Sequence, residues 1–428
     1  MNPIRTPINF LMRLLVFLIL TSYVVPIFAQ EKVAASRSSL AYSLTKDLDN
    51  FRGMSLIPGF AVSIVNEKGV RYLKGFGVAD KAKDVEFTPL TINDVASVSK
   101  TFVAVAIMKL VEQGQLKLDA PVNSLLPYKI TNPHYPDSAI TVRHLVTHTS
   151  SIIDSFEPYS VGEADVVLEN EKDPTKVPAY IQPNVEWHKM SRKITLDENI
   201  RKYTQPGGKW YSKDTFLRKE PGTHFQYSNL AASIAARIVE RRSGMSFIDF
   251  TKKYLFAPLG MKDTAWNLAD LDPTRLSMLY VQNDDKKPTG VAEYPRYFMT
   301  NYPVSGLKTN ATDLGKFLIE MIRGSHGAGI ILNKQTYKSL FEPQRNARYL
   351  PKLDPKSIPP GEDISVLWSI SKDGAYYHLG GNIGVSAFVH FNPKTKTGSL
   401  AFCNLRDDSF AGVQTLVYRY ENQFTGIK

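Results

Sequence analysis

Ser97 and Lys100 place a hydroxyl and an amine three residues apart at the start of an apolar stretch, ASVSKTFVAVAIMKLVEQG. Residues i and i+3 lie on one face of a helix, with Cβ atoms about 5–6 Å apart. The surrounding apolar side chains would lower the pKa of Lys100 by penalising its ammonium form, as a base near neutral pH requires. The N–H groups at the helix start would favour a developing anion. The alternative is that Ser97 or Ser99 only caps the helix and Lys100 reaches solvent.

The Ser-x-x-Lys spacing is weak evidence alone, because the chain contains three further copies. These are Ser43/Lys46, Ser305/Lys308 and Ser369/Lys372. Only the copy at Ser97 opens a long, almost wholly apolar helix, and this context distinguishes it. Ser99 is the weaker candidate, because Lys100 is its immediate neighbour and points elsewhere.

A second group of polar side chains lies at the start of another predicted helix, over residues 229–242, in Tyr227-Ser228-Asn229. A phenol such as that of Tyr227 can carry a proton when a nearby ammonium stabilises its phenolate. The amide of Asn229 can donate and accept, which suits it to hold a substrate amide or a lysine.

A third motif, His378-Leu379-Gly380-Gly381, lies at the end of a predicted strand. The glycine pair Gly380 and Gly381 would let a ligand approach the backbone closely. A backbone N–H on this strand, paired with that of Ser97, would form an oxyanion hole.

The elements around these motifs predict an α+β fold. Apolar spacing predicts a helix over 36–53, and two strand-like runs around Asn66–Gly69 predict a hairpin over 59–80. In the C-terminal third, strands separated by short turns predict an antiparallel sheet, followed by an amphipathic helix after Asp408. We expect both sets of strands to form one antiparallel sheet flanked by helices, with a cleft beside a mostly helical lobe.

The chain divides into four predicted parts. They are a signal peptide (1–29), an N-terminal part of the α/β domain (30–118), a helical lobe with insertions (119–303) and a C-terminal part of the α/β domain (304–428). Within the lobe, helices are predicted over 229–242 and 247–256, whereas 153–180 and 281–296 lack periodicity and are predicted surface insertions. The aromatic-rich stretch 203–222 is either a rim of a pocket or an ordinary loop.

The N-terminus has the features of a secretory signal. Arg5 and Arg13 precede a 12-residue apolar core, and the small Ala29 suits the position before cleavage at Gln30. An uncleaved anchor is the alternative, but the core is shorter than the ~20 residues that a spanning helix needs. No cysteine follows the core, which excludes a lipoprotein anchor. We therefore expect a periplasmic or secreted protein, in which the single Cys403 is a buried strand residue.

The formal net charge is +11, and +9 remains after the two arginines of the signal are subtracted. The basic residues are scattered, so nucleic acid is not an expected partner. The charge suits association with anionic envelope polymers, although an ordinary basic surface is the simpler interpretation. No oligomeric state follows from the sequence.

In order and spacing, Ser97-x-x-Lys100, Tyr227-x-Asn229 and the motif at His378 and Gly380 resemble the three motifs of the serine β-lactamase and penicillin-binding-protein superfamily, near its class C branch. The segments ITVRHLVTHTSSI, SGMSFIDFTKKYLFAPLGMKDTAW and VSGLKTNATDLGKFL are similar to further segments of that family. The resemblance extends over roughly residues 40–425. It implies a β-lactamase/transpeptidase-like fold.

The resemblance also implies roles for the residues. Ser97 would be the acylated nucleophile, and Lys100 and Tyr227 would share general-base catalysis and proton return. Asn229 would orient the substrate amide and the lysine. Backbone N–H groups of Ser97 and Gly381 would form the oxyanion hole.

Three departures from the family pattern stand out. His378 occupies the place where many relatives have a lysine that attracts a substrate carboxylate, so we expect weaker carboxylate recognition. A histidine here is common among the peptidases and esterases of the family. Ser151 follows Thr149-Ser150 where relatives usually have glycine, and Tyr227 follows Ser97 by 130 positions (227 − 97), which implies an insertion in the lobe.

The sequence thus predicts a secreted serine hydrolase that forms an acyl-enzyme on Ser97. Its substrate would be a small molecule or peptide, namely an ester, an amide, a D-amino-acid peptide or a β-lactam. No cofactor or metal is expected, because His144 and His148 have zinc-like spacing but no glutamate follows His144. The alternative is a catalytically silent relative that binds cell-wall peptides or a partner.

Overall fold

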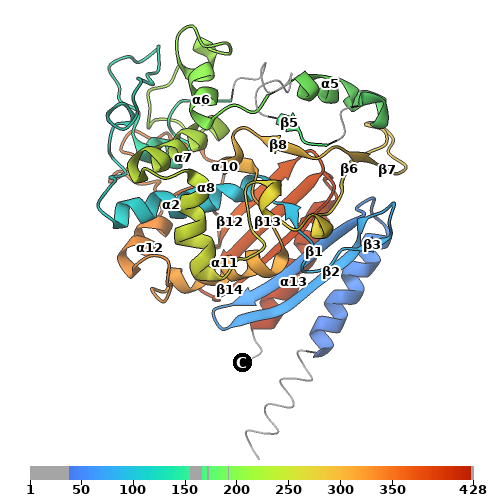
Figure 1. The fold of residues 1–428 in the computed structure, drawn as a ribbon. Coiled ribbons are helices and arrows are strands. Elements are labelled where there is room, and N and C mark those ends of the chain that lie inside the picture. Colours follow the sequence, from blue (N-terminus) through green and yellow to red (C-terminus); the bar gives the residue numbers. More distant parts are fainter. Residues whose placement is uncertain (1–37, 155–165, 171–172, 191, 426–428) are drawn as a thin grey trace, which may run out of the picture.

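The structure is a computed structural model that describes residues 38–154, 166–170, 173–190 and 192–425. The predicted signal peptide, 1–29, lies outside this range. Among the described helices, none combines the length and apolar character needed to cross a membrane. The chain folds into a large sheet with helices on both faces and a mostly helical lobe beside it (Figure 1), so the predicted α+β architecture is confirmed.

One antiparallel sheet of eight strands combines strands from the N-terminal and C-terminal parts of the described chain. Its order is β10-β11-β12-β13-β14-β1-β2-β3. The strands are β1 (Gly59–Asn66), β2 (Gly69–Asp80), β3 (Val85–Glu86), β10 (Asp363–Ile364), β11 (Ser369–Ile370), β12 (Tyr376–Asn382), β13 (Val385–Asn392) and β14 (Thr397–Cys403). Because Phe60 of β1 pairs opposite Cys403 of β14, the N-terminal hairpin joins the C-terminal strands as predicted.

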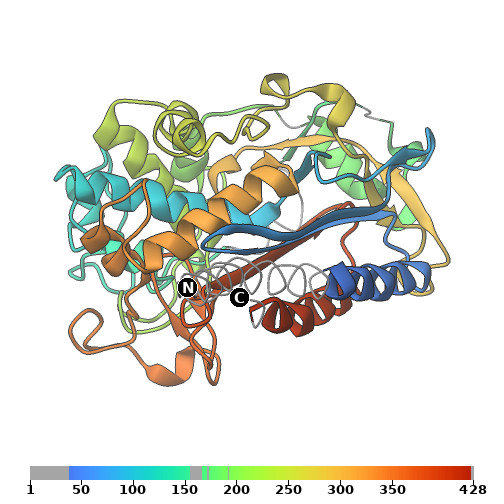
Figure 2. The same ribbon diagram turned by 90° about the horizontal axis from the view of Figure 1, so that it is seen from below.

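The two faces of the sheet bury two different cores (Figure 2). Successive strand residues point to opposite faces, so Phe60 and Val62 of β1 enter one core while Ala61 enters the other. The helix over 38–53 and α13 (Phe410–Thr425) cover the first face. Helix α11 (Ala311–Ser325) covers the second, which is continuous with the core of the lobe.

Short helices dominate the lobe and its junction with the sheet. They are α2 (Lys100–Glu112), α3 (Val142–Val146), α5 (Gln182–Met190), α6 (Leu196–Thr204), α7 (Asn229–Ser243), α8 (Phe247–Thr251), α9 (Ala257–Leu259), α10 (Tyr302–Ser305) and α12 (Lys334–Phe341). The hydroxyl of Ser228 accepts from the Ala231 N–H at 3.0 Å and caps α7, which ends at Gly244 with a left-handed φ of 71°. A π-helical turn, Lys252–Phe256, joins α8 to α9.

Two parts of the lobe differ from the sequence prediction. Residues 281–296, expected to be irregular, contain most of a hairpin of β6 (Leu279–Gln282) and β7 (Val291–Tyr294). In the described part of 153–180, β5 (Val166–Leu168) pairs with β8 (Tyr297–Met299). These two-stranded ribbons are three or four residues long, too short to show a clear alternation of apolar and polar residues.

The stretch 203–222 packs as an ordinary part of the lobe. Tyr203 is fully buried and its ring lies 5.2 Å from that of Trp210. None of the described residues 203–222 lines the cavity beside Ser97. Of the two alternatives for this stretch, the structure therefore favours the ordinary loop.

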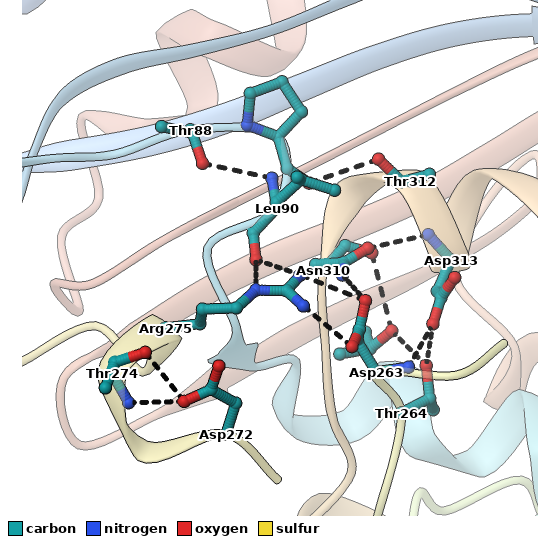
Figure 3. Close-up of polar contacts among 12 residues, drawn as sticks. Thr88, Leu90, Asp263, Thr264, Asp272, Thr274, Arg275, Asn310, Thr312 and Asp313 are labelled. Carbon is teal, nitrogen blue, oxygen red and sulfur yellow. Dashed lines mark hydrogen bonds and ion pairs between the residues drawn. The ribbon is translucent and has the colours of Figure 1, made fainter.

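A polar network fixes the segment that returns from the lobe to the sheet (Figure 3). The carboxylate of Asp263 receives two hydrogen bonds from Arg275, at 2.8 and 3.0 Å, and one from Asn310 at 3.1 Å. The buried carboxylate of Asp313 accepts from the backbone N–H of Asp263 at 2.8 Å and from the hydroxyl of Thr264. The network therefore joins segments about 50 residues apart in sequence and holds the chain that follows β9 (Lys308–Thr309).

Candidate active site

Ser97 lies on a tight 3-10 turn, Ala96–Ser99, that leads into α2. The turn begins with Ala96 in a left-handed conformation, at φ 45°. The hydroxyl of Ser99 donates to the carbonyl of Ala96 at 2.6 Å and accepts from the Leu307 N–H at 3.1 Å. Ser99 is thus engaged by the backbone and points away from Lys100, whereas Ser97 remains partly exposed.

The segment over residues 304–309 lies directly against this turn. β9 pairs with β4 (Asn93–Asp94), and the Val95 N–H donates to the Leu307 carbonyl at 3.1 Å. Lys308 forms a buried ion pair with Asp94 at 3.1 Å. This lysine of another Ser-x-x-Lys copy is therefore committed to a structural contact.

The amine of Lys100 connects three parts of the fold at one point. Its Nζ donates to Ser97 Oγ at 3.1 Å, to Asn229 Oδ1 at 2.7 Å and to the Val304 carbonyl at 2.8 Å. The side chain is fully buried, and burial lowers its pKa to about 7 although the charge of Asp154 acts in the opposite direction. Near neutral pH the lowered pKa allows a neutral form of this amine, and the lone pair of that form can accept a proton from Ser97.

Tyr227 lies over Lys100 and contacts Ser97. The centroid of its ring is 5.0 Å from Lys100 Nζ, and its hydroxyl is hydrogen-bonded to Ser97. Although 36% of the residue is exposed, the hydroxyl end is enclosed by the site, and burial raises its pKa above 10 despite the Ser97 contact. A phenolate is therefore disfavoured in the resting site, and the phenol is available to relay a proton.

Asp154 orients Asn229 and was not identified from the sequence. Its carboxylate accepts from the Asn229 N–H at 2.9 Å, the Asn229 Nδ2 at 2.8 Å, the Leu230 N–H at 2.9 Å and the Ser228 hydroxyl at 3.2 Å. These contacts also place a negative charge at the N-terminus of α7. The amide of Asn229 is consequently fixed with its oxygen toward Lys100.

The strand motif lies next to the turn that carries Ser97. β11 pairs with β12 at Tyr376 and Tyr377, so this pairing ends before His378. A Cβ on Gly380 would clash with the Val95 carbonyl and lie 3.3 Å from the Ser97 nitrogen. Only glycine lets the strand approach this closely. A Cβ on Gly381, which points to the opposite face, would overlap the guanidinium of Arg406.

A cavity of about 440 Å³ opens beside these residues. Its lining includes Ser97, Tyr227, His378 and both motif glycines, together with His148, Trp368 and Arg406. The structure therefore brings the predicted site residues together: Ser97, Tyr227, His378, Gly380 and Gly381 line this cavity, the buried Lys100 is hydrogen-bonded to Ser97, and Asn229 is hydrogen-bonded to Lys100.

Comparison with known proteins agrees with this architecture. Residues 44–418 match the family model described as Beta-lactamase. The chain belongs to the beta-lactamase family. Protein flp of Staphylococcus aureus (strain MW2) is 24% identical over 354 residues, which are 82% of this chain and 60% of that protein. The chain thus matches about 60% of the length of this relative.

Solved structures show the same beta-lactamase-family fold. The octameric penicillin-binding protein homologue from Pyrococcus abyssi superposes with a TM-score of 0.66 at 24% identity, over 89% of this chain and 77% of that one. A D-amino acid amidase from Ochrobactrum anthropi SV3 gives a TM-score of 0.66 at 19% identity, over 91% of this chain and 100% of that one. The predicted fold and family are therefore confirmed.

Two histidines lie beside Tyr227 in this site. The ring centroid of His148 lies 4.6 Å from that of Tyr227, and that of His378 lies 6.4 Å away. Burial, aided by the charge of Lys100, lowers the pKa of His378 to about 3 and that of His148 well below 6.5. Both rings are therefore neutral at physiological pH, which agrees with the expectation that the site lacks the usual cation at His378.

His144 and His148, although spaced like zinc ligands, make contacts of other kinds. The Nδ1 of His144 accepts from the Thr141 N–H at 3.3 Å and completes a capping box at the start of α3. His148 packs against Tyr227, a position that its spacing in the sequence did not reveal. The backbone of Ser151 is left-handed, at φ 59°, a conformation that glycine adopts more readily than serine.

Proposed function

We propose that the protein is a serine hydrolase that forms an acyl-enzyme on Ser97. The observation that carries this proposal is the buried amine of Lys100, hydrogen-bonded to Ser97 Oγ and held by Asn229. A lysine with a pKa of about 7 is a competent base near neutral pH, and the serine lies within reach of it.

The proposed reaction has two halves. Lys100 takes the Ser97 proton as Oγ attacks the substrate carbonyl, and backbone N–H groups of Ser97 and Gly381 stabilise the oxyanion. The bond to the leaving group then breaks, and the proton passes through Lys100 and Tyr227 to the departing oxygen or nitrogen. Water, deprotonated by the same pair, releases the acid product and regenerates Ser97.

We expect the substrate to be an ester, an amide, a D-amino-acid peptide or a β-lactam. A shared fold with the D-amino acid amidase named above supports a small acyl compound as the substrate class. We also propose a secreted or periplasmic location, based on the features of residues 1–29, and association with anionic envelope polymers through the net charge of +9 (11 − 2) that remains after cleavage. N-terminal sequencing of the exported protein would test cleavage between Ala29 and Gln30.

Covalent labelling tests the proposed activity. A fluorescent fluorophosphonate should label the wild-type protein, and Ser97→Ala should abolish the label. Ser43→Ala, in another Ser-x-x-Lys copy, should leave it unchanged. Absence of label on the wild-type protein would favour the alternative, a silent protein that binds peptides. A fluorescent penicillin, used in parallel, reports whether β-lactams are recognised.

A further inference from the structure

The ring proton of His378 lies on Nδ1, which leaves Nε2 unprotonated. Its Nδ1 lies 2.7 Å from the carbonyl oxygen of Leu379. A carbonyl oxygen can only accept, so Nδ1 must be the donor in this contact. Because the ring is neutral, Nε2 keeps its lone pair and is a hydrogen-bond acceptor.

His148, on the same tyrosine, has the opposite arrangement. The backbone N–H of Ser228 donates to its Nδ1 at 3.2 Å, so the proton of this neutral ring lies on Nε2. The two rings near Tyr227 are therefore opposite tautomers. Of these two rings, both of which line the cavity, only His378 has an Nε2 that can accept a hydrogen bond.

Neither Lys100 nor Arg406 takes over the role expected of the lysine that many relatives have in place of His378. The amine of Lys100 is already bonded to three oxygens behind Ser97. Of the described residues that line the cavity, Arg406 alone carries a full positive charge. Its guanidinium packs against Gly381, whereas Gly380, on the opposite face of β12, is the residue that faces Ser97.

We propose that His378 selects acyl substrates with a hydrogen-bond donor, such as an amine or hydroxyl, rather than a carboxylate, next to the carbonyl that Ser97 attacks. This inference rests on the proposed serine hydrolase activity and specifies its substrate class. A donor would bond to Nε2 of His378. A carboxylate would meet its lone pair instead, and would be desolvated without a partner.

A matched series of p-nitroanilides tests this preference. The acyl group is CH3–CHX–CO, with X an amino group, a hydroxyl, a carboxylate or hydrogen, so that only the group near the carbonyl changes. We expect kcat/KM for the amino and hydroxyl compounds to exceed that of the unsubstituted compound by about 3- to 10-fold, the effect of one hydrogen bond. The carboxylate compound should be the slowest of the four.

Variants of His378 provide the controls. His378→Phe keeps a ring without a nitrogen, and should bring the ratios between the four compounds close to one. His378→Gln keeps an acceptor and should retain part of the preference, whereas His378→Lys should favour the carboxylate compound. Fastest turnover of the carboxylate compound by the wild-type protein, or unchanged ratios in His378→Phe, would overturn the inference.

Two further measurements separate this inference from the proposed function. The same four compounds are tested as competitors of fluorophosphonate labelling, so binding is measured even where turnover is slow. Normal labelling with equal competition by all four compounds would refute the role of His378 and leave the hydrolase activity standing. Absence of labelling would refute the hydrolase activity itself. Imidazole ¹⁵N shifts, assigned with His378→Phe, should show Nδ1 protonated, and a proton on Nε2 would contradict the inference directly.

Discussion

Asp154 holds Asn229 by two atoms at once, through its backbone N–H at 2.9 Å and its side-chain Nδ2 at 2.8 Å. The amide oxygen of Asn229 is thereby left to accept from Lys100 Nζ at 2.7 Å. Of the two orientations that a side-chain amide can take, only one lets it donate to a carboxylate and accept from an amine. Asp154 therefore determines that Asn229 presents its amide oxygen, and not its nitrogen, to Lys100.

Replacing Asp154 by Asn should weaken both the fold and the reaction. The new amide cannot accept on both of its terminal atoms, so N–H groups at the start of α7 lose a partner, and we expect a loss of about 1–3 kcal/mol in the free energy of unfolding. Urea unfolding measures this loss. Asp272→Asn is the control at an exposed turn. Asp272 accepts two bonds, both through Oδ1, whereas Asp154 accepts four, so the loss in Asp272→Asn should be smaller. Equal losses would contradict the role of Asp154.

The rate of fluorophosphonate labelling should fall as the pH falls through about 7. Burial lowers the pKa of Lys100 to about 7, and only the neutral amine, present above that pKa, can take the Ser97 proton. The pH dependence of the second-order labelling rate provides the measurement. A rate that stays constant down to about pH 5, well below that pKa, would exclude Lys100 as the base.

The same pH profile should move in a defined direction in Asp154→Asn. The carboxylate of Asp154 raises the pKa of Lys100, opposing the effect of burial. Removing this charge should lower the pKa, so the acidic limb of the profile should shift to lower pH even where the maximal rate is reduced. Movement to higher pH would show that Asp154 acts on the reaction by another route.

Gly380→Ala should reduce the labelling rate far more than Gly381→Ala. The added methyl group at residue 380 meets backbone, the carbonyl of Val95, whereas at residue 381 it meets the end of a flexible arginine, Arg406. Backbone cannot move aside without shifting β12 away from Ser97, but a guanidinium can. Labelling rates of the two variants, compared at equal folded fractions, test this difference, and similar rates would argue against close contact at Gly380.

Asp94→Asn should destabilise the fold by about 3–5 kcal/mol, because it leaves the buried ammonium of Lys308 without a counter-ion. Adding Lys308→Met removes that charge and should recover part of the loss. Thermal unfolding of the single and double variants measures the recovery. A double variant less stable than Asp94→Asn would indicate that Lys308 contributes through the hydrogen bond from its amine to the Gly306 carbonyl, and not through the ion pair.

The sequence predicted those site residues whose relationship is local. Ser97 and Lys100 are three positions apart, so turn geometry alone brings them together. Tyr227 and Asn229 share one helix start in the same way. Bringing the two pairs to one site required the family resemblance, because the Lys100 and Asn229 contact joins residues 129 positions apart.

The residues that the sequence did not reveal act through distant partners. Asp154 binds a helix 75 positions away and shows no motif of its own. His148 was considered for its spacing to His144, yet its contact with Tyr227 depends on tertiary packing. The strands β6 and β7 were missed because two short, partly exposed strands contain too few residues to show a period of two.

The left-handed backbone at Ala96 bears on any effort to make this protein withstand heat. Holding alanine in this conformation costs about 1–2 kcal/mol, which glycine would avoid at the expense of about 0.5–1 kcal/mol of added chain freedom. Ala96→Gly would thus gain little, and it would loosen the peptide that aims Ser97. Selection for thermal resistance alone would therefore leave Ala96 in place, and the strain beside Ser97 would remain part of the fold.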